Sequence, residues 1–415
     1  CCPFLCHHVR KTKTLKHNKT EILIASSSSD WSDEIWSDWD RVLISNPSAY
    51  LNSKSIKAAL DVPHRKLQAV RWVDENACTI GVAQIEDSHA LSQSEGHFLK
   101  ADKPVFKLAQ RYLYRGDGIF QFPVRVMGTV LSSGDHAYRF TDAFPESGRH
   151  NALHEALNIK CIDSSESPKS SLIKDHYTDK PWEEKLAGRS QWHKDWIDLE
   201  FDPVMEVDLN PNWNTFEDYT AALRKKSRTK IRRILRGSEE LVLKNLTLNK
   251  VQAYSQDLHA LYNQVYDRAG FKLGRLYPED LVELKRQWGD HFPVIAYYLD
   301  DKLVGFQCGI TTESCTEAFF VGFSFEENKI HSIYQRMLLE FIKQAITTGS
   351  QRIALGRTAL DIKSSLGACP KRLICHMRVD RPLVHVLTKV IARASSPKIP
   401  QLKRAWDDES VSILA

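Results

Sequence analysis

Residues 330–349, Ile-His-Ser-Ile-Tyr-Gln-Arg-Met-Leu-Leu-Glu-Phe-Ile-Lys-Gln-Ala-Ile-Thr-Thr-Gly, decide the fold that this sequence predicts. Apolar side chains recur every three or four residues from Ile330 to Ile346, and this spacing predicts one long amphipathic helix. Gly349 follows at the position where a glycine commonly ends a helix. The segments on either side of this helix define the architecture around it.

Strand patterns flank the helix on both sides. Residues 294–299 and 303–310 read as two strands, and Asp300-Asp301-Lys302 forms a tight turn between them. A third strand is predicted at 317–325, and short strands follow the helix at 352–355 and 372–379. Two more helices are expected before the hairpin, one over 252–267 and one that Pro278-Glu279-Asp280 opens.

The first half of the chain has a similar order of elements. It starts with a strand at 21–25 and a helix in which Trp31, Ile35, Trp36, Trp39 and Val42 form one stripe, a spacing that favours a buried face over a ligand platform. A hairpin at 67–73 and 79–85, a strand at 122–131 and a helix at 151–157 follow. The repeated order of hairpin, strand, helix and strand predicts two related domains.

Changes in composition set the expected boundaries. We expect a disordered N-terminus over 1–20 and a first domain over 21–200, which includes an exposed linker rich in Ser, Lys, Asp and Pro at 162–195. The second domain is expected over 201–385, and a C-terminal tail over 386–415.

Composition excludes several classes of protein. The 415 residues are 42% hydrophobic and 26% charged, which is ordinary for a globular protein. No apolar run reaches the roughly 18 residues that a membrane-spanning helix needs, and no signal peptide is visible. Nine scattered cysteines do not form a disulfide framework, so we expect a cytoplasmic protein with reduced thiols. Cys1, Cys2, Cys6, His7 and His8 lack a partner set at zinc-site spacing, so no metal is expected.

The segment most suggestive of chemistry is Gly356–Pro370, directly after the strand at 352–355. Gly356 and Gly367 permit close approach of the backbone or a positive φ. Arg357 and Lys363 place two cations in one loop, where arginine suits a phosphate or carboxylate and lysine supplies a compact charge. A surface loop with two solvated cations explains the same residues equally well.

This segment resembles the C-terminal signature of the FemABX-like acyltransferases, a two-domain family within the GNAT superfamily. The resemblance rests on Gly356-Arg357-Thr358, Ile362-Lys363, Leu366-Gly367-Ala368, Pro370 and Leu373, where Ile362 and Leu366 replace the family's usual Phe and Trp. In the first half, Gly128 and Ser133-Gly134-Asp135-His136 resemble an element of peptidoglycan-related GNAT proteins. The resemblance implies an α/β (α+β) fold of two tandem GNAT-like domains, each a mixed, mostly antiparallel sheet flanked by helices.

The resemblance also implies an N-acyltransferase. An acetyl or aminoacyl group would pass from acyl-CoA, such as acetyl-CoA, or from aminoacyl-tRNA to an amine acceptor, for example a cell-wall or sugar-nucleotide precursor. GNAT enzymes seat the donor pyrophosphate at the start of the long helix, which here is Asn328 to Ser332. No glycine lies between Phe323 and Gly349, an absence that suits donors other than CoA. Asn328 or Ser332 also fits a simple helix cap.

The roles expected of single residues follow from direct transfer, since no Ser-His-Asp order calls for a covalent intermediate. Lys363 would stabilise negative charge near the acyl centre, and His331 and Tyr334 would handle protons, although Tyr334 also fits core packing. Donor-binding residues, together with Asn328 and Ser332, would be Gly356, Arg357, Thr358 and Gly367. Asp361 is expected to pair with Lys363.

A second feature is the basic helix over 224–236, which holds eight cations. Arg232 and Arg233 are candidate contacts for tRNA, a nucleotide-linked substrate or an anionic membrane surface. Two alternatives to an enzyme therefore stay open. One is an RNA-binding module centred on this helix, and the other is a non-catalytic GNAT scaffold that binds a polysaccharide precursor.

Overall fold

The computed structural model describes residues 20–93, 119–159, 169–177, 196–394 and 402–406. The chain divides into two compact units. Unit 1 comprises Cys1–Phe201, Gly270–Arg275 and Leu373–Ser396, and unit 2 comprises Asp202–Ala269, Leu276–Arg372 and Pro397–Ala415. None of the helices in these described ranges is long and apolar enough to cross a bilayer.

Unit 1 is built on a nine-stranded sheet with the order β1-β2-β3-β4-β6-β16-β7, and β5 and β10 both pair with β3. The strands are β1 (Glu21–Ala25), β2 (Leu67–Val73), β3 (Thr79–Gln93), β4 (Ile119–Met127), β5 (Tyr138–Phe140), β6 (Ser170–Tyr177), β7 (Ile197–Glu200), β10 (Phe271–Lys272) and β16 (Leu373–Val379). Its helices are α1 (Asp33–Arg41), α2 (Ser53–Leu60), α4 (Glu146–Leu157) and α14 (Pro382–Ala394). Only β4 and β6 run parallel among these pairs.

Unit 2 contains a seven-stranded sheet with the order β15-β8-β14-β13-β12-β11-β9. The strands are β8 (Val204–Asp208), β9 (Val242–Asn245), β11 (Val294–Leu299), β12 (Lys302–Thr311), β13 (Thr316–Phe323), β14 (Arg352–Ala354) and β15 (Cys369–Lys371). The helices are α6 (Phe216–Ala222), α7 (Lys225–Gly237), α8 (Leu248–Ala253), α9 (Ser255–Asp267), α10 (Pro278–Trp288), α11 (Phe325–His331), α12 (Ile333–Thr347) and α13 (Leu360–Ser364). Again one pair, β13 with β14, is parallel.

The two sheets share the order of elements that the sequence predicted. In unit 1 the hairpin β2–β3, strand β4 and helix α4 lead to β6, which runs parallel to β4. In unit 2 the hairpin β11–β12, strand β13 and helix α12 lead to β14, which runs parallel to β13. The prediction of two mixed, mostly antiparallel sheets flanked by helices is confirmed.

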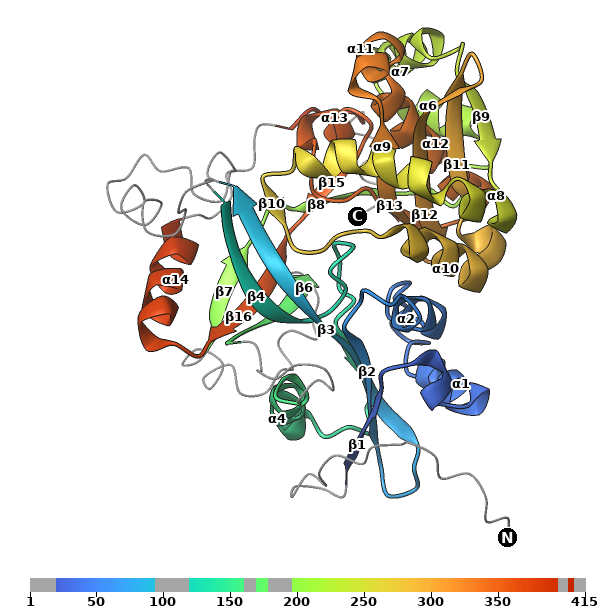
Figure 1. Cartoon of the computed structure of the whole chain (residues 1–415). Helices are drawn as coiled ribbons and strands as arrows, with labels where there is room; N and C mark the ends of the chain where they lie inside the picture. The colour runs from blue at the N-terminus through green and yellow to red at the C-terminus, as the bar shows by residue number, and fades with distance from the viewer. Residues whose placement is uncertain (1–19, 94–118, 160–168, 178–195, 395–401, 407–415) are drawn as a thin grey trace. The chain divides into compact units, whose positions relative to one another are not determined.

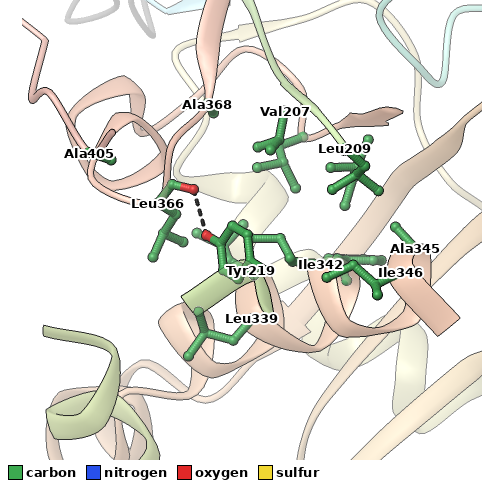
Figure 2. Close-up of a cluster of buried hydrophobic side chains, with 14 of the residues drawn as sticks. Val207, Leu209, Tyr219, Leu339, Ile342, Ala345, Ile346, Leu366, Ala368 and Ala405 are labelled. Carbon is green, nitrogen blue, oxygen red and sulfur yellow. Dashed lines mark hydrogen bonds between the residues drawn. The ribbon is translucent and has the colours of Figure 1, made fainter. Parts of the chain in front are cut away.

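Helix α12 supplies much of the core of unit 2. Leu338, Phe341, Ile342 and Ala345 are almost fully buried against strand residues such as Ile353. Figure 2 shows Tyr219 of α6 in this cluster, where its hydroxyl donates a 2.6 Å hydrogen bond to the Leu366 carbonyl. This bond fixes the segment after α13 to the core.

The long helix is broken where the sequence predicts continuity. Helix α11 ends at His331, Ser332 adopts φ +52° and α12 begins at Ile333. Ile330 belongs to the expected apolar stripe but is 70% exposed, because the break turns it away from the core.

Three segments differ from their predicted places. The strand at 373–379, predicted in the second domain, is β16, and it pairs with β6 and β7 in the sheet of unit 1. The predicted linker 162–195 contains β6, in which all eight residues are buried. The predicted tail includes most of α14 as well as Trp406, which packs in unit 2. Residues 1–19 and the rest of the predicted linker lie outside the described residues.

Candidate active site

The parallel strands of unit 2 separate after a short pairing. Thr316 pairs with Ile353 and Glu317 with Ala354, and no further pairs follow, although β13 continues to Phe323. On its other side β13 stays paired with β12 and contains a register shift opposite Cys308 and Gly309. The chain after β14 therefore diverges from β13, while Leu355 and Gly356 stay hydrogen-bonded to Met205 of β8.

Gly356 shapes the loop that follows β14. Its φ of +76° is in the region that favours glycine. Its carbonyl accepts hydrogen bonds from the Met205 amide at 3.1 Å and from the Lys363 Nζ at 3.2 Å. Ala359, at φ +55°, then starts the short helix α13, which returns the chain so that Lys363 reaches Gly356.

Lys363 is the most unusual residue of this loop. Its side chain is almost fully buried, with a relative exposure of 2%, and burial lowers the pKa of its ammonium to about 7. A Cβ built on Gly356 would lie 4.0 Å from Nζ, so the ammonium faces the point where the chain leaves β14. Asp361, its predicted partner, instead pairs with Lys403 at 2.6 Å. In the described part of the chain no carboxylate forms an ion pair with Lys363.

Tyr334 links α12 to the same loop. Burial raises the pKa of its phenol to about 12, and the nearby Thr358 side chain moderates this rise. The Tyr334 amide donates to the Asn328 Oδ1 at 2.8 Å, so Asn328 caps the start of α12 as the alternative interpretation expected. Two elements thus meet the loop after β14: α13 brings Lys363 to Gly356, and α12 brings the Tyr334 phenol near Thr358.

The structure does not bring His331 to this group. His331 Nδ1 lies 3.6 Å from Glu240 Oε2, and Nε2 lies 4.0 Å from Glu327 Oε2, so its ring faces two carboxylates. Ser332 connects the two helices and its side chain makes no capping bond. Arg357 is half-buried, with its Nε shielded from solvent.

Gly367, predicted to contact the donor, has a packing role in the structure. Its φ is +89°, and an added Cβ would lie 2.2 Å from the Trp406 indole. The indole Nε1 donates to the Gly367 carbonyl at 2.9 Å, and the ring stacks on Trp213 with a centroid distance of 5.6 Å. Gly367 therefore provides space for Trp406.

Helix α7 presents a dense basic surface. Its exposed cations, which we call the α7 basic face, are Lys225, Lys226, Arg232, Arg233 and Arg236. Lys230 of the same helix donates to the Ser365 hydroxyl at 2.6 Å and so ties α7 to the end of α13. Partial burial lowers the pKa of Lys230, and the nearby charges of Lys403 and Arg233 lower it further.

Two buried carboxylates, which the sequence pattern did not predict as site residues, lie beside the strand divergence. Glu206 of β8 and Glu317 of β13 both pair with Ala354, so the two side chains share a face of the sheet. Each has a relative exposure of 4%, and Arg352 bonds Glu206 at 2.9 Å. In the sequence, the available signal for each carboxylate was an acidic residue flanked by mostly apolar residues in a strand. Among the described residues no cluster of His, Cys, Asp and Glu could hold a metal ion.

Comparisons with known proteins agree with this architecture. A family model described as an acetyltransferase (GNAT) domain matches residues 224–364. The crystal structure of FemX aligns with 85% of this chain and 98% of the FemX chain, at 10% sequence identity and a TM-score of 0.50. This similarity is one of fold. The structure of a tandem GNAT protein from the clavulanic acid biosynthesis pathway aligns with 88% of this chain and 99% of its own chain, at 11% identity and a TM-score of 0.47. No curated protein sequence matches the chain.

Proposed function

Since residues 224–364 match the model of an acetyltransferase (GNAT) domain, we propose that unit 2 is an N-acyltransferase, which moves an acyl group from an activated donor to an amine acceptor. The observation that carries this proposal is Lys363, a buried ammonium that donates to the Gly356 carbonyl just beyond the end of β14. Burying a cation without a paired carboxylate is costly. Such a cation is therefore expected where an anion binds or where negative charge develops during a reaction.

The proposed reaction is a direct transfer. The amine nitrogen forms a bond to the acyl carbon, and the bond from that carbon to the donor sulfur or oxygen breaks. Lys363 in its protonated form stabilises the negative charge that develops during this attack. The Tyr334 phenol, whose pKa burial raises to about 12, is protonated at neutral pH, so its hydroxyl can supply a proton to the leaving atom. Glu317, buried on the same sheet, is a candidate to receive the proton that the amine loses.

The same loop would hold the donor. Gly356 and Thr358 lie next to Lys363 and Tyr334, and Arg357 follows in the chain as a planar cation suited to a phosphate or carboxylate. His331, which faces Glu240 and Glu327, would affect proton transfer only from a distance.

Two observations favour aminoacyl-tRNA over acyl-CoA as the donor. The first turn of α11, which follows β13, carries Glu326 and Glu327, and their charge disfavours a pyrophosphate there. The α7 basic face offers five exposed cations on a helix that Lys230 joins to the end of α13. A polyanionic donor matches this surface, and the acceptor we propose is an amine on a cell-wall or sugar-nucleotide precursor.

Transfer assays with each donor test this proposal. The full chain is incubated with acetyl-CoA, longer acyl-CoAs or charged tRNA and an amine acceptor, and product is measured by mass spectrometry. We expect Lys363→Met and Arg357→Ala to lose transfer while the fold is retained, and Lys250→Met, a change of an exposed cation on α8 outside the α7 basic face, to keep it. Full activity of both loop variants would contradict the assignment. Binding of RNA or of a glycan without transfer would instead favour the binding module or the scaffold.

The pH dependence of transfer gives a second test. If the protonated form of Lys363 is required, kcat/KM falls as pH rises through about 7. Arginine stays charged at all accessible pH values. If the Lys363→Arg variant keeps measurable activity, its kcat/KM should therefore not fall as pH rises through this range. A profile that instead rises through the same range would assign Lys363 the role of a base.

A further inference from the structure

Helix α14 exposes an unusual number of apolar side chains. Seven large hydrophobic residues are exposed in the described part of the chain, and three of them lie on this helix. Val384 is 42% exposed, Val386 62% and Val390 47%. Val386 and Val390 are one turn apart and therefore share a face. Scattered exposed valines need no explanation, but Val386 and Val390 lie side by side on this 13-residue helix, whereas Val384, two residues before Val386, points to another side of it.

The helix is attached to unit 1 through other residues. It contacts β7 and β16, and Ala392 packs against the cluster that contains Leu199 and Cys375. Figure 1 shows α14 lying beside these two strands. Val386 and Val390 face outward on this attached helix and leave an apolar surface for another partner.

The charge of the segment indicates which partner this is. From Arg381 to Ser396 the sequence contains Arg381, Lys389 and Arg393 and no acidic residue. Arg381 is exposed and Lys389 is half-buried. Cations next to exposed valines match an anionic bilayer, whose headgroups attract the cations while its hydrocarbon boundary accepts the valines.

We propose that α14 docks unit 1 reversibly on an anionic membrane surface. The helix lies in the plane of the interface, so no membrane-spanning segment is needed. Val386 and Val390 enter the boundary between headgroups and acyl chains, and the basic residues stay at the phosphates. One short helix gives weak binding that depends on lipid charge and on salt. This docking is independent of the reaction proposed for unit 2.

Vesicle sedimentation tests the proposal with the full chain. The protein is mixed with vesicles of phosphatidylcholine alone, or of about three parts phosphatidylcholine to one part phosphatidylglycerol. We expect binding to the anionic vesicles only, a loss of binding at high salt, and a decrease of roughly tenfold or more for the double variant Val386→Glu, Val390→Glu. Ile44→Glu is the matched control, since Ile44 is 75% exposed in unit 1 but lies outside α14.

Three outcomes would overturn the proposal. They are equal sedimentation of the double variant and the parent, equal binding to neutral vesicles, and no binding at low salt. Light scattering of the protein without lipid identifies the competing occupant. If the parent self-associates and the double variant is monomeric, α14 contacts a second copy of the chain and the membrane assignment is wrong.

Discussion

Replacing Lys363 by methionine should stabilise unit 2 near neutral pH and have little effect at high pH. The folded chain releases the Lys363 proton at a pKa of about 7, whereas an unfolded lysine holds its proton to about 10.4. Between these values the unfolded chain binds more protons than the folded one, so the stability of the parent protein rises with pH. Methionine has a similar length and no charge, so its variant lacks this dependence.

The magnitude follows from the same pKa. Burial lowers the pKa of Lys363 from 10.5 to about 7, and each pKa unit of this decrease is worth about 1.36 kcal/mol. At pH 6 and below, the buried cation therefore lowers the free energy of unfolding by roughly 5 kcal/mol. The variant loses the hydrogen bond to the Gly356 carbonyl, about 1 kcal/mol, although that carbonyl keeps the Met205 amide as a donor. We therefore expect a net gain of about 4 kcal/mol at low pH, which disappears near pH 10.

Denaturant unfolding at about pH 6 and about pH 10 measures this difference. Because the chain has two units, hydrogen exchange of the α12 amides should accompany it, since these amides report unit 2 alone. Lys226→Met on the exposed face of α7 is the control and should change stability by less than about 0.5 kcal/mol. An equal stability difference at both pH values, or a destabilised variant at pH 6, would refute the reasoning.

Three other predictions concern unit 2. Gly367→Ala should lower the free energy of unfolding of unit 2 by about 2 kcal/mol or more in urea, because the new Cβ meets the Trp406 indole. Adding Trp406→Ala should recover part of this loss. Strictly additive losses from the two substitutions would contradict the coupling. Tyr334→Phe should lower kcat with little change in the thermal midpoint, and unchanged kcat would remove the phenol from the proposed reaction. Charge reversal of Arg232 and Arg233 should weaken RNA binding and lower its salt slope, and an unchanged slope would place RNA elsewhere.

Much of the fold could be predicted because local patterns determine it. The hairpin of β11 and β12, strand β13 and helix α12 each have a clear apolar period, and their order resembles a known family. Strand β16 was assigned to the wrong domain because a strand pattern does not show which sheet it joins. Strand β6, Ser-Ser-Leu-Ile-Lys-Asp-His-Tyr, was missed because its polar side chains are buried by long-range contacts, such as the Cys375 thiol that donates to Asp175 at 3.1 Å.

The candidate site was predictable in its residue types and not in its geometry. The signature identified Lys363, but only the turn through Ala359 and α13 shows that this lysine is buried. Tyr334 and His331 looked equivalent in the sequence because they are near neighbours at the start of the predicted helix. The break at Ser332 directs them differently, so that Tyr334 reaches Thr358 and His331 faces Glu240.

The position of β16 between β6 and β7 has a consequence for biosynthesis. The inner part of the unit 1 sheet is completed only when Leu373–Val379 becomes available, long after β6 and β7, which end at Tyr177 and Glu200, have been translated. Until then β6 and β7 each lack a hydrogen-bonding neighbour and present strand edges of the kind that promote aggregation. A premature stop shortly before Leu373 would therefore harm the amino-terminal unit, whose own early sequence is intact, and a ribosome-bound chaperone would be needed longest for that unit.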